Sequence, residues 1–131
     1  MSVKIIHAAD FHLDSAFGAL RADKARLRRQ ESRALLSRLG ELVNARGADI
    51  LLLSGDLFDG ETVYRETLEA LAASLGAMHA RVFIAPGNHD PYTARSPYAL
   101  PIWPENVHIF TSGCVERVDI PALPCAVYGA A

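Results

Sequence analysis

The stretch ILLLSGD, residues 50–56, indicates the class of fold. Its continuous apolar run is too short for a helix and ends in a Gly-Asp turn, which is typical of a strand covered on both faces, as in a parallel sheet. Two further strands are predicted on either side of it along the chain, at Val3–Ala8 and at Arg81–Ala85. We therefore expect a parallel sheet in which residues 50–54 form a strand covered on both faces.

Helical periodicity fills the two segments between these strands. From about Ala22 to Ala45, one apolar series recurs at spacings of three, four and seven, and Gly47 stands where a helix C-cap is expected. A second helix is predicted over Glu61–His79. The apolar series of the first helix is Leu27, Ala34, Leu35, Leu39, Leu42 and Val43, and that of the second is Tyr64, Leu68, Leu71, Ala72 and Leu75. The order strand, helix, strand, helix, strand implies right-handed parallel crossovers and an α/β layered fold.

The second half of the chain changes character. Residues 91–106 contain four prolines, which predicts a long loop rather than a helix. Three shorter strands follow, at Val107–Phe110, Gly113–Ile120 and Cys125–Tyr128, and the turn at residues 121–124 joins the last two as a hairpin. The chain stops directly after an apolar run, without a capping helix, so we expect an interrupted domain.

Composition limits the classes of protein to consider. The chain has 131 residues, half of them hydrophobic, which suits one domain with a core. The net charge of −2 argues against a wholly basic surface but leaves room for a local nucleic-acid groove. No apolar run approaches membrane-spanning length, and the start shows no signal-peptide pattern. Cys114 and Cys125 are expected to be two buried thiols, so the expected compartment is the cytoplasm.

Acidic, amide and imidazole side chains follow each of the three main strands. The carboxyl ends of parallel strands share one edge of a sheet, so these residues are expected to meet there. Each block alone could be an ordinary turn or helix cap, but that account must apply three times at the same end of successive strands. Oxygen and imidazole ligands without a thiolate suit Mn²⁺, Fe²⁺ or Zn²⁺. The residues are Asp10, His12 and Asp14, then Asp56 and Asp59, and finally Asn88, His89 and Asp90.

These blocks resemble the first three signature blocks of the calcineurin-like metallophosphoesterases. They read Asp10-Phe11-His12, Gly55-Asp56-Leu57-Phe58-Asp59 and Gly87-Asn88-His89-Asp90. Two stretches are similar to bacterial DNA repair exonucleases of the SbcD type, especially the YhaO-like branch. They are residues 7–14, around the first block, and residues 98–110, which include Trp103. The resemblance implies that residues 1–131 are the N-terminal part of a single phosphoesterase domain, about half of a two-sheet β-sandwich flanked by helices.

The resemblance also implies a role for each residue. Asp10 and His12 would hold one metal ion, Asp56 would bridge two, and Asn88 would hold the second through its side-chain oxygen. His89 would contact the phosphate and protonate the leaving oxygen as the catalytic acid. The cofactor would be two divalent ions, Mn²⁺ by preference and Fe²⁺ or Zn²⁺ as alternatives. The residues expected to orient ligands or close turns are Asp14, Asp59 and Asp90.

The sequence departs from the family pattern after His89. The family completes its site with a Gly-His block and a Gly-His-x-His block, whereas this chain has only His108 downstream, without a preceding glycine. His108 lies in an alternating, strand-like run, and we interpret it as structural. The present chain would therefore hold about half of the family's ligand set.

The function implied by the resemblance is metal-dependent phosphodiester hydrolysis, with water activated between two metal ions. A DNA exonuclease acting in DNA repair beside an SMC-like ATPase subunit is the leading interpretation. The alternatives are a small-molecule phosphodiesterase or phosphatase, and an inactive metal-binding fragment or interaction module. The resemblance, rather than the composition, favours DNA.

Two sequence features leave the mode of DNA contact open. Basic residues are concentrated in and around the first helix, where they could contact DNA phosphates, form a solvated face or pair with another subunit, including a second copy of the chain. The aromatic residues of the long loop could stack on unpaired bases or pack onto their own domain. The basic residues are Arg21, Lys24, Arg26, Arg28, Arg29, Arg33, Arg38 and Arg46, and the loop residues are Tyr92, Arg95, Tyr98 and Trp103.

Overall fold

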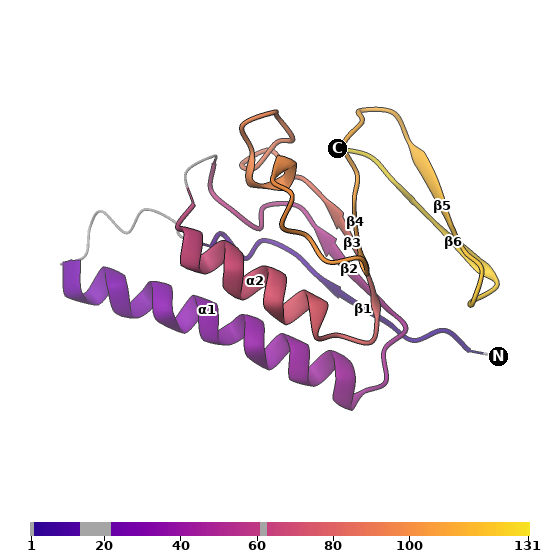
Figure 1. The fold of residues 1–131 in the computed structure, drawn as a ribbon, viewed down its shortest axis with the longest axis horizontal. Coiled ribbons are helices and arrows are strands. Elements are labelled where there is room, and N and C mark those ends of the chain that lie inside the picture. The colour runs from indigo at the N-terminus through magenta and orange to yellow at the C-terminus, as the bar shows by residue number, and fades with distance from the viewer. Residues whose placement is uncertain (1, 14–21, 61–62) are drawn as a thin grey trace.

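The computed structural model describes residues 2–13, 22–60 and 63–131. A parallel sheet lies between two helices and a hairpin (Figure 1). The elements in chain order are β1 (Ile5–Ala8), α1 (Ala22–Ala45), β2 (Ile50–Ser54), α2 (Arg65–Gly76), β3 (Arg81–Ala85), the 3₁₀ turn η1 (Pro97–Ala99), β4 (Val107–Ile109), β5 (Glu116–Ile120) and β6 (Cys125–Gly129).

The main sheet has the strand order β1-β2-β3-β4, and every neighbouring pair is parallel. Strands β5 and β6 form a separate antiparallel pair, in which Ile120 is opposite Cys125. The helices lie on one side of the sheet and the hairpin on the other, as Figure 1 shows. This arrangement confirms the predicted α/β class and the predicted hairpin.

The two faces of the sheet bury two different cores. Leu51, Leu53 and Val82 belong to the cluster shared with the helices, whereas Ile50 and Phe83 belong to the cluster shared with the hairpin. Alternate residues of a strand point to opposite faces, so a continuous apolar run is what a sheet covered on both sides requires. The apolar run at residues 50–53 is explained in this way.

Several predicted boundaries need correction, although α1, β2 and β3 are found where they were predicted. Helix α2 covers Arg65–Gly76 rather than residues 61–79, with Tyr64 as an extended N-cap and Ala77 as the C-cap. Residues 61–62 lie outside the described part of the chain. Strand β1 begins two residues later than predicted and β5 three later, and β4 ends one residue earlier and β6 one residue later.

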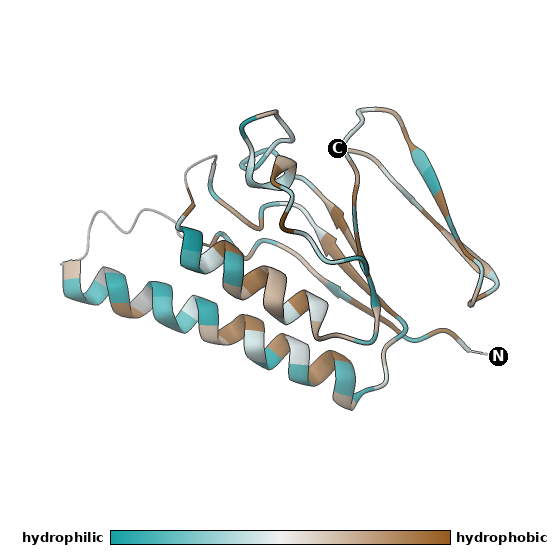
Figure 2. Ribbon diagram, viewed as in Figure 1, coloured by the Kyte–Doolittle hydropathy of each residue, from teal (hydrophilic) through white to brown (hydrophobic). Residues whose placement is uncertain are grey.

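The apolar series predicted for α1 does not face the core as a whole. Of the series, Val43 is buried, but Leu27, Leu35 and Leu42 are about half exposed, at 54%, 46% and 45%. Leu36, which the predicted series did not include, is also buried. Figure 2 shows apolar residues alternating with polar ones along this helix. Because α1 is covered on only one side, a 3.6-residue period cannot bury every leucine of the series. Its end was predicted correctly: Gly47 has a φ of 61° and donates its N–H to the Asn44 carbonyl.

Two further predictions concern the cysteines and the membrane. Both cysteines are free, but Cys114 is exposed and Cys125 half-buried, which corrects the expectation of two buried thiols. Within residues 2–13, 22–60 and 63–131, no helix has both the length and the apolar character needed to cross a bilayer.

Candidate metal centre

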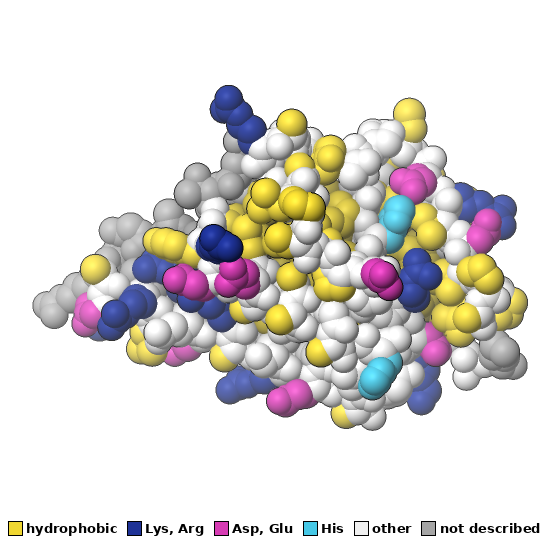
Figure 3. Space-filling model, viewed as in Figure 1, with side chains coloured by type: hydrophobic (Ala, Val, Ile, Leu, Met, Phe, Trp, Pro, Cys, Tyr) yellow, Lys and Arg dark blue, Asp and Glu magenta, His cyan; other side chains and the backbone are white. Residues whose placement is uncertain are grey.

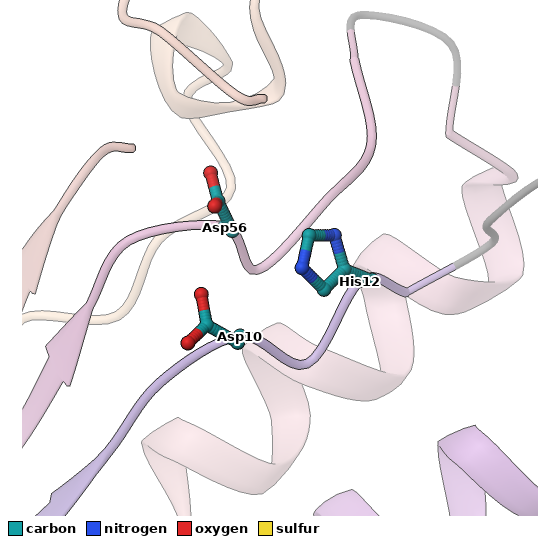
Figure 4. Close-up of side chains that lie close together, drawn as sticks. All are labelled: Asp10, His12 and Asp56. Carbon is teal, nitrogen blue, oxygen red and sulfur yellow. The ribbon is translucent and has the colours of Figure 1, made fainter. Parts of the chain in front are cut away.

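Three predicted ligands come together at the carboxyl ends of β1 and β2. Asp10 and His12 follow β1, and Asp56 follows β2. One potential ligand atom from each of the three lies within 4.8 Å of the others. In Figure 4 the three side chains approach one another from two neighbouring loops. The expectation that separate blocks would meet at one edge of the sheet is therefore met for these three residues.

These residues share an unusual backbone conformation. Asp10, His12 and Asp56 have φ values of 59°, 47° and 54°. The left-handed region is sparsely populated by residues other than glycine, and each such residue costs about 1–3 kcal/mol unless its surroundings impose the conformation. Backbone strain of this kind is concentrated at functional sites, so three cases among three clustered ligands support a functional interpretation.

The loop after β1 is held against the loop after β2 by backbone hydrogen bonds. The N–H of Asp10 donates to the Gly55 carbonyl at 3.1 Å, and the N–H of His12 donates to the Asp56 carbonyl at 2.9 Å. Leu13, which is only 1% exposed, anchors the end of this loop in the helix-side core. These contacts fix the strained residues relative to one another.

The ring of His12 is oriented by Asp59. Nδ1 of His12 is hydrogen-bonded to a carboxylate oxygen of Asp59. This hydrogen bond, with the neighbouring carboxylates of Asp59, Asp56 and Asp10, raises the pKa of His12 above its ordinary value, although desolvation opposes the rise. A partner on one ring nitrogen sets the tautomer, so Nε2 is the atom that can bind a metal.

Asp90 joins the loop after β2 to the loop after β3. Its buried carboxylate accepts the N–H of Gly87 at 2.6 Å, of Asp56 at 3.0 Å and of Phe58 at 3.2 Å. The hydroxyl of Tyr98 donates to the same carboxylate. Asp90 therefore contacts the backbone of a candidate ligand without reaching the metal position itself.

The third block lies beside the three clustered ligands. The backbone N–H of His89 donates to Asp56 Oδ1 at 2.9 Å, and the His89 ring is 5.3 Å from the His12 ring, edge to face. Asn88 and His89 are both exposed. Asp14, which was also predicted to support the site, lies outside the described residues. The individual roles of all these residues remain predictions.

The donor set fits a divalent cation. The ligand atoms of two carboxylates and an imidazole lie within 4.8 Å of one another. Carboxylates this close repel each other without a counter-charge. Among the described residues Asp10 is exposed, His12 half-buried and Asp56 buried. Oxygen and imidazole donors of this kind bind Mn²⁺, Fe²⁺ and Zn²⁺ and do not single out one of them.

The aromatic residues of the long loop pack onto their own domain. Tyr98 is 4% exposed and stacks on Trp103 with ring centroids 6.1 Å apart. The indole N–H of Trp103 donates to the Pro97 carbonyl at 3.3 Å. The Tyr98 ring is therefore not displayed for stacking on bases, Trp103 is half-buried, and Tyr92 and Arg95 are exposed. The contact between Tyr98 and Asp90 had no signal in the sequence.

His108 has the structural setting that was expected. It lies in β4, with its ring 4.9 Å from Phe110 and 6.0 Å from Phe83. Its Nε2 atom lies 3.0 Å from a carboxylate oxygen of Glu116. His108 thus connects β4 to the hairpin rather than joining the cluster of Asp10, His12 and Asp56.

The basic residues of α1 have different roles. The guanidinium groups of Arg29 and Arg33 lie 5.1 Å and 5.9 Å from the ring centre of Tyr64, and Arg33 Nε donates to Thr67 Oγ1 at 2.7 Å. These two residues join α1 to α2 and its N-cap. The other basic residues with described side chains in this helix region are exposed, namely Lys24, Arg26, Arg38 and Arg46. On the face drawn in Figure 3, cationic and anionic side chains are interspersed.

Arg21 and the side chain of Arg28 lie outside the described part of the structure.

The chain is similar to a family model and to known proteins. A family model described as calcineurin-like phosphoesterase matches residues 3–125. The D subunit of the nuclease SbcCD from Rhodobacter capsulatus is 35% identical over 94 residues, which are 68% of this chain and 22% of that protein. The uncharacterized metallophosphoesterase YhaO of Bacillus subtilis is 32% identical over 119 residues, 86% of this chain and 28% of that protein. The match thus spans about a quarter of the length of these relatives.

Proposed function

Since this chain belongs to the calcineurin-like phosphoesterase family, we propose that it supplies part of a metal-dependent phosphodiesterase centre. The observation that carries the proposal is the cluster of Asp10, His12 and Asp56, three strained residues whose ligand atoms lie within 4.8 Å of one another. We further propose that residues 1–131 form the N-terminal part of one phosphoesterase domain. The relatives that the chain matches are several times longer, which agrees with that proposal.

Each residue of the centre has a proposed task. Asp10 and His12 would hold one cation, Asp56 would serve both cations, and Asn88 would serve the second. His89 donates a proton to the leaving oxygen of the substrate. Two observations support this role: the His89 N–H donates a hydrogen bond to the Asp56 carboxylate, and His89 is exposed. A positioned acid of this kind contributes about 10²–10⁴-fold to a rate.

Two divalent ions, with Mn²⁺ preferred and Fe²⁺ or Zn²⁺ as alternatives, would supply Lewis acidity that polarises a phosphoryl oxygen and activates water. The chain itself orients the carboxylates and the imidazole that would bind these ions. Asp59 fixes the ring of His12, and Asp90 fixes the turn that carries Asp56.

DNA is the proposed substrate, hydrolysed by an exonuclease that acts in DNA repair. This part of the proposal is supported by the relative that is named as a subunit of the nuclease SbcCD. The proposed partner is an SMC-like ATPase subunit, and pairing with a second copy of the chain is a further proposal. Two free cysteines agree with the reducing cytoplasm as the proposed compartment.

A second candidate is a metal-binding module without activity of its own. One observation favours it: among the described residues, only Asp10, His12 and Asp56 form a cluster of three or more acidic, histidine or cysteine ligands. Three ligands are enough for one cation, whereas two cations need more.

The proposal is tested by calorimetric titration of the full 131-residue chain with Mn²⁺, beside Asp56→Asn and His89→Gln. Two binding sites in the wild type, lost in Asp56→Asn and unchanged in His89→Gln, would support the assigned roles. Equal loss of binding in both variants would contradict the assigned roles. One weak site without any hydrolysis would favour the metal-binding module.

The substrate is tested with linear duplex DNA and a chromogenic phosphodiester in the presence of Mn²⁺. Hydrolysis of DNA that disappears in Asp56→Asn supports the nuclease. Hydrolysis of the small diester alone would favour a small-molecule phosphoesterase instead.

A further inference from the structure

Tyr98 lies in the 3₁₀ turn η1, within the long loop after β3, and its surroundings hold it in place. The loop is braced around it: the Ser96 N–H and hydroxyl both donate to the Thr93 carbonyl, at 3.1 Å and 2.8 Å, and the Ala99 N–H donates to the Ser96 carbonyl at 3.0 Å. The Tyr98 ring also contacts Trp103 and Phe58, whose ring centroid is 5.5 Å away. The position of its hydroxyl is therefore fixed by the fold.

That hydroxyl completes the set of donors around Asp90. An ionised carboxylate offers about four acceptor positions, and here three backbone N–H groups and one hydroxyl point at them. Two of the three N–H groups belong to Asp56 and to Phe58, the residues at and just beyond the left-handed turn. The Asp90 carboxylate thus holds the backbone of Asp56 and of Phe58 in place.

We infer that Tyr98 is a positioning residue of the metal centre, which acts through Asp90 to hold Asp56 in its left-handed conformation. The inference rests on the proposed function only in taking Asp56 as a metal ligand. The proline-rich loop thereby has a role in supporting the centre. Tyr98 itself is too buried to stack on a base.

The chemistry of Tyr98 suits a permanent donor. Burial, together with the hydrogen bond to Asp90, raises its pKa well above the ordinary value for tyrosine. The raised pKa favours the protonated hydroxyl, which is the form that donates to Asp90.

The test compares wild-type protein with Tyr98→Phe, which removes only the hydroxyl, and with Tyr92→Phe, the same substitution at an exposed position of the same loop. Two quantities are measured: Mn²⁺ affinity by calorimetry, and amide hydrogen exchange of the metal-free protein by NMR. Loss of a partner that orients a metal ligand weakens metal affinity by about 10–100-fold, and we expect that loss in Tyr98→Phe alone. We also expect roughly tenfold faster exchange at the amides of Asp56, Phe58 and Gly87, because one hydrogen bond of their shared acceptor is gone.

The outcomes separate the inference from the proposed function. Mn²⁺ affinity and local exchange in Tyr98→Phe that equal those of the wild type would overturn the inference. Faster exchange spread evenly over β2 and β3 would also overturn it, because it would show a general packing role. If the wild type binds no Mn²⁺, the proposed function fails, while the exchange at these three amides still decides whether Tyr98 holds the turn.

Discussion

Gly87 lies directly against Asp56, and this contact shows how little space the centre leaves for change. A Cβ atom at position 87 would be 2.3 Å from Asp56 Oδ1 and 2.7 Å from its backbone nitrogen. Its backbone N–H also donates to Asp90. Glycine is therefore required here by close approach, because any side chain would displace either a candidate ligand or the loop that carries it.

Gly87→Ala should weaken Mn²⁺ binding and lower the free energy of unfolding by about 1–3 kcal/mol, the usual range for overpacking. The measurements are calorimetric titration and urea denaturation. Gly40→Ala is the control. Gly40 lies in helix α1, and the nearest atom to an added Cβ there is Met78 Cε, at an ordinary contact distance of 3.7 Å. That variant should be neutral or more stable, because alanine favours a helix. Unchanged Mn²⁺ affinity in Gly87→Ala would show that the turn relaxes freely.

Asp59 provides a second prediction at the residue scale. Asp59→Asn should weaken Mn²⁺ affinity by about 10–100-fold, because an amide holds the His12 ring less firmly than a carboxylate does. Asp49→Asn is a matched control at the opposite end of the sheet, where Asp49 accepts the backbone N–H of Lys4 at 2.9 Å. Equal Mn²⁺ affinity in Asp59→Asn and wild type would exclude this supporting role.

At the scale of elements, the turn between α2 and β3 is tied down by Asn106, which precedes β4. Its amide nitrogen donates to the carbonyls of Leu75 at 2.8 Å, Ala80 at 3.1 Å and Met78 at 3.3 Å. These carbonyls lie at the end of α2 and in the turn that follows, where helix carbonyls have no partner within the helix. Asn106 thus provides partners for carbonyls at the end of α2 and in the turn before β3.

Asn106→Asp should destabilise the protein by about 1–3 kcal/mol, since it replaces an amide donor with a carboxylate that faces three carbonyls. Urea denaturation measures the change. Asn44→Asp should cost less, because Asn44 donates only to the Ala77 carbonyl and keeps its acceptor for the His79 N–H. The reverse order of the two variants would contradict the role given to Asn106.

At the scale of the whole molecule, the hairpin and the sheet are joined through one apolar layer. Phe110, Phe83, Ile50 and Ile120 form its buried part. Gly129, at the end of β6, lies against the ring of Phe110, where a Cβ would be 2.4–2.6 Å from three ring carbons. The hairpin can therefore approach the sheet only because position 129 has no side chain.

Gly129→Ala should lower the free energy of unfolding by about 1–3 kcal/mol by forcing the hairpin away from Phe110. Gly113→Ala, where an added Cβ meets nothing within 4 Å, should leave the unfolding free energy close to that of the wild type. Thermal unfolding followed by circular dichroism measures both. Mn²⁺ affinity should stay the same in Gly129→Ala, since the ligands lie in loops that the hairpin does not hold.

The sequence by itself determined the parts of the fold that depend on local patterns. Strands β2 and β3 and helix α1 have their predicted bounds, because short apolar runs and a 3.6-residue period are properties of neighbouring residues. The meeting of Asp10, His12 and Asp56 was also predictable, because parallel strands place the residues that follow them at one edge.

Only the tertiary structure decided which side chains touch across long distances in the chain. It exposed Leu35 of α1, turned Tyr98 inward to Asp90, and gave the three clustered ligands their left-handed backbone. The physical reason is that periodicity records how a residue relates to its neighbours in the chain. Burial and hydrogen bonding depend instead on which partners the folded chain brings to it, and many of those partners lie far away in the sequence.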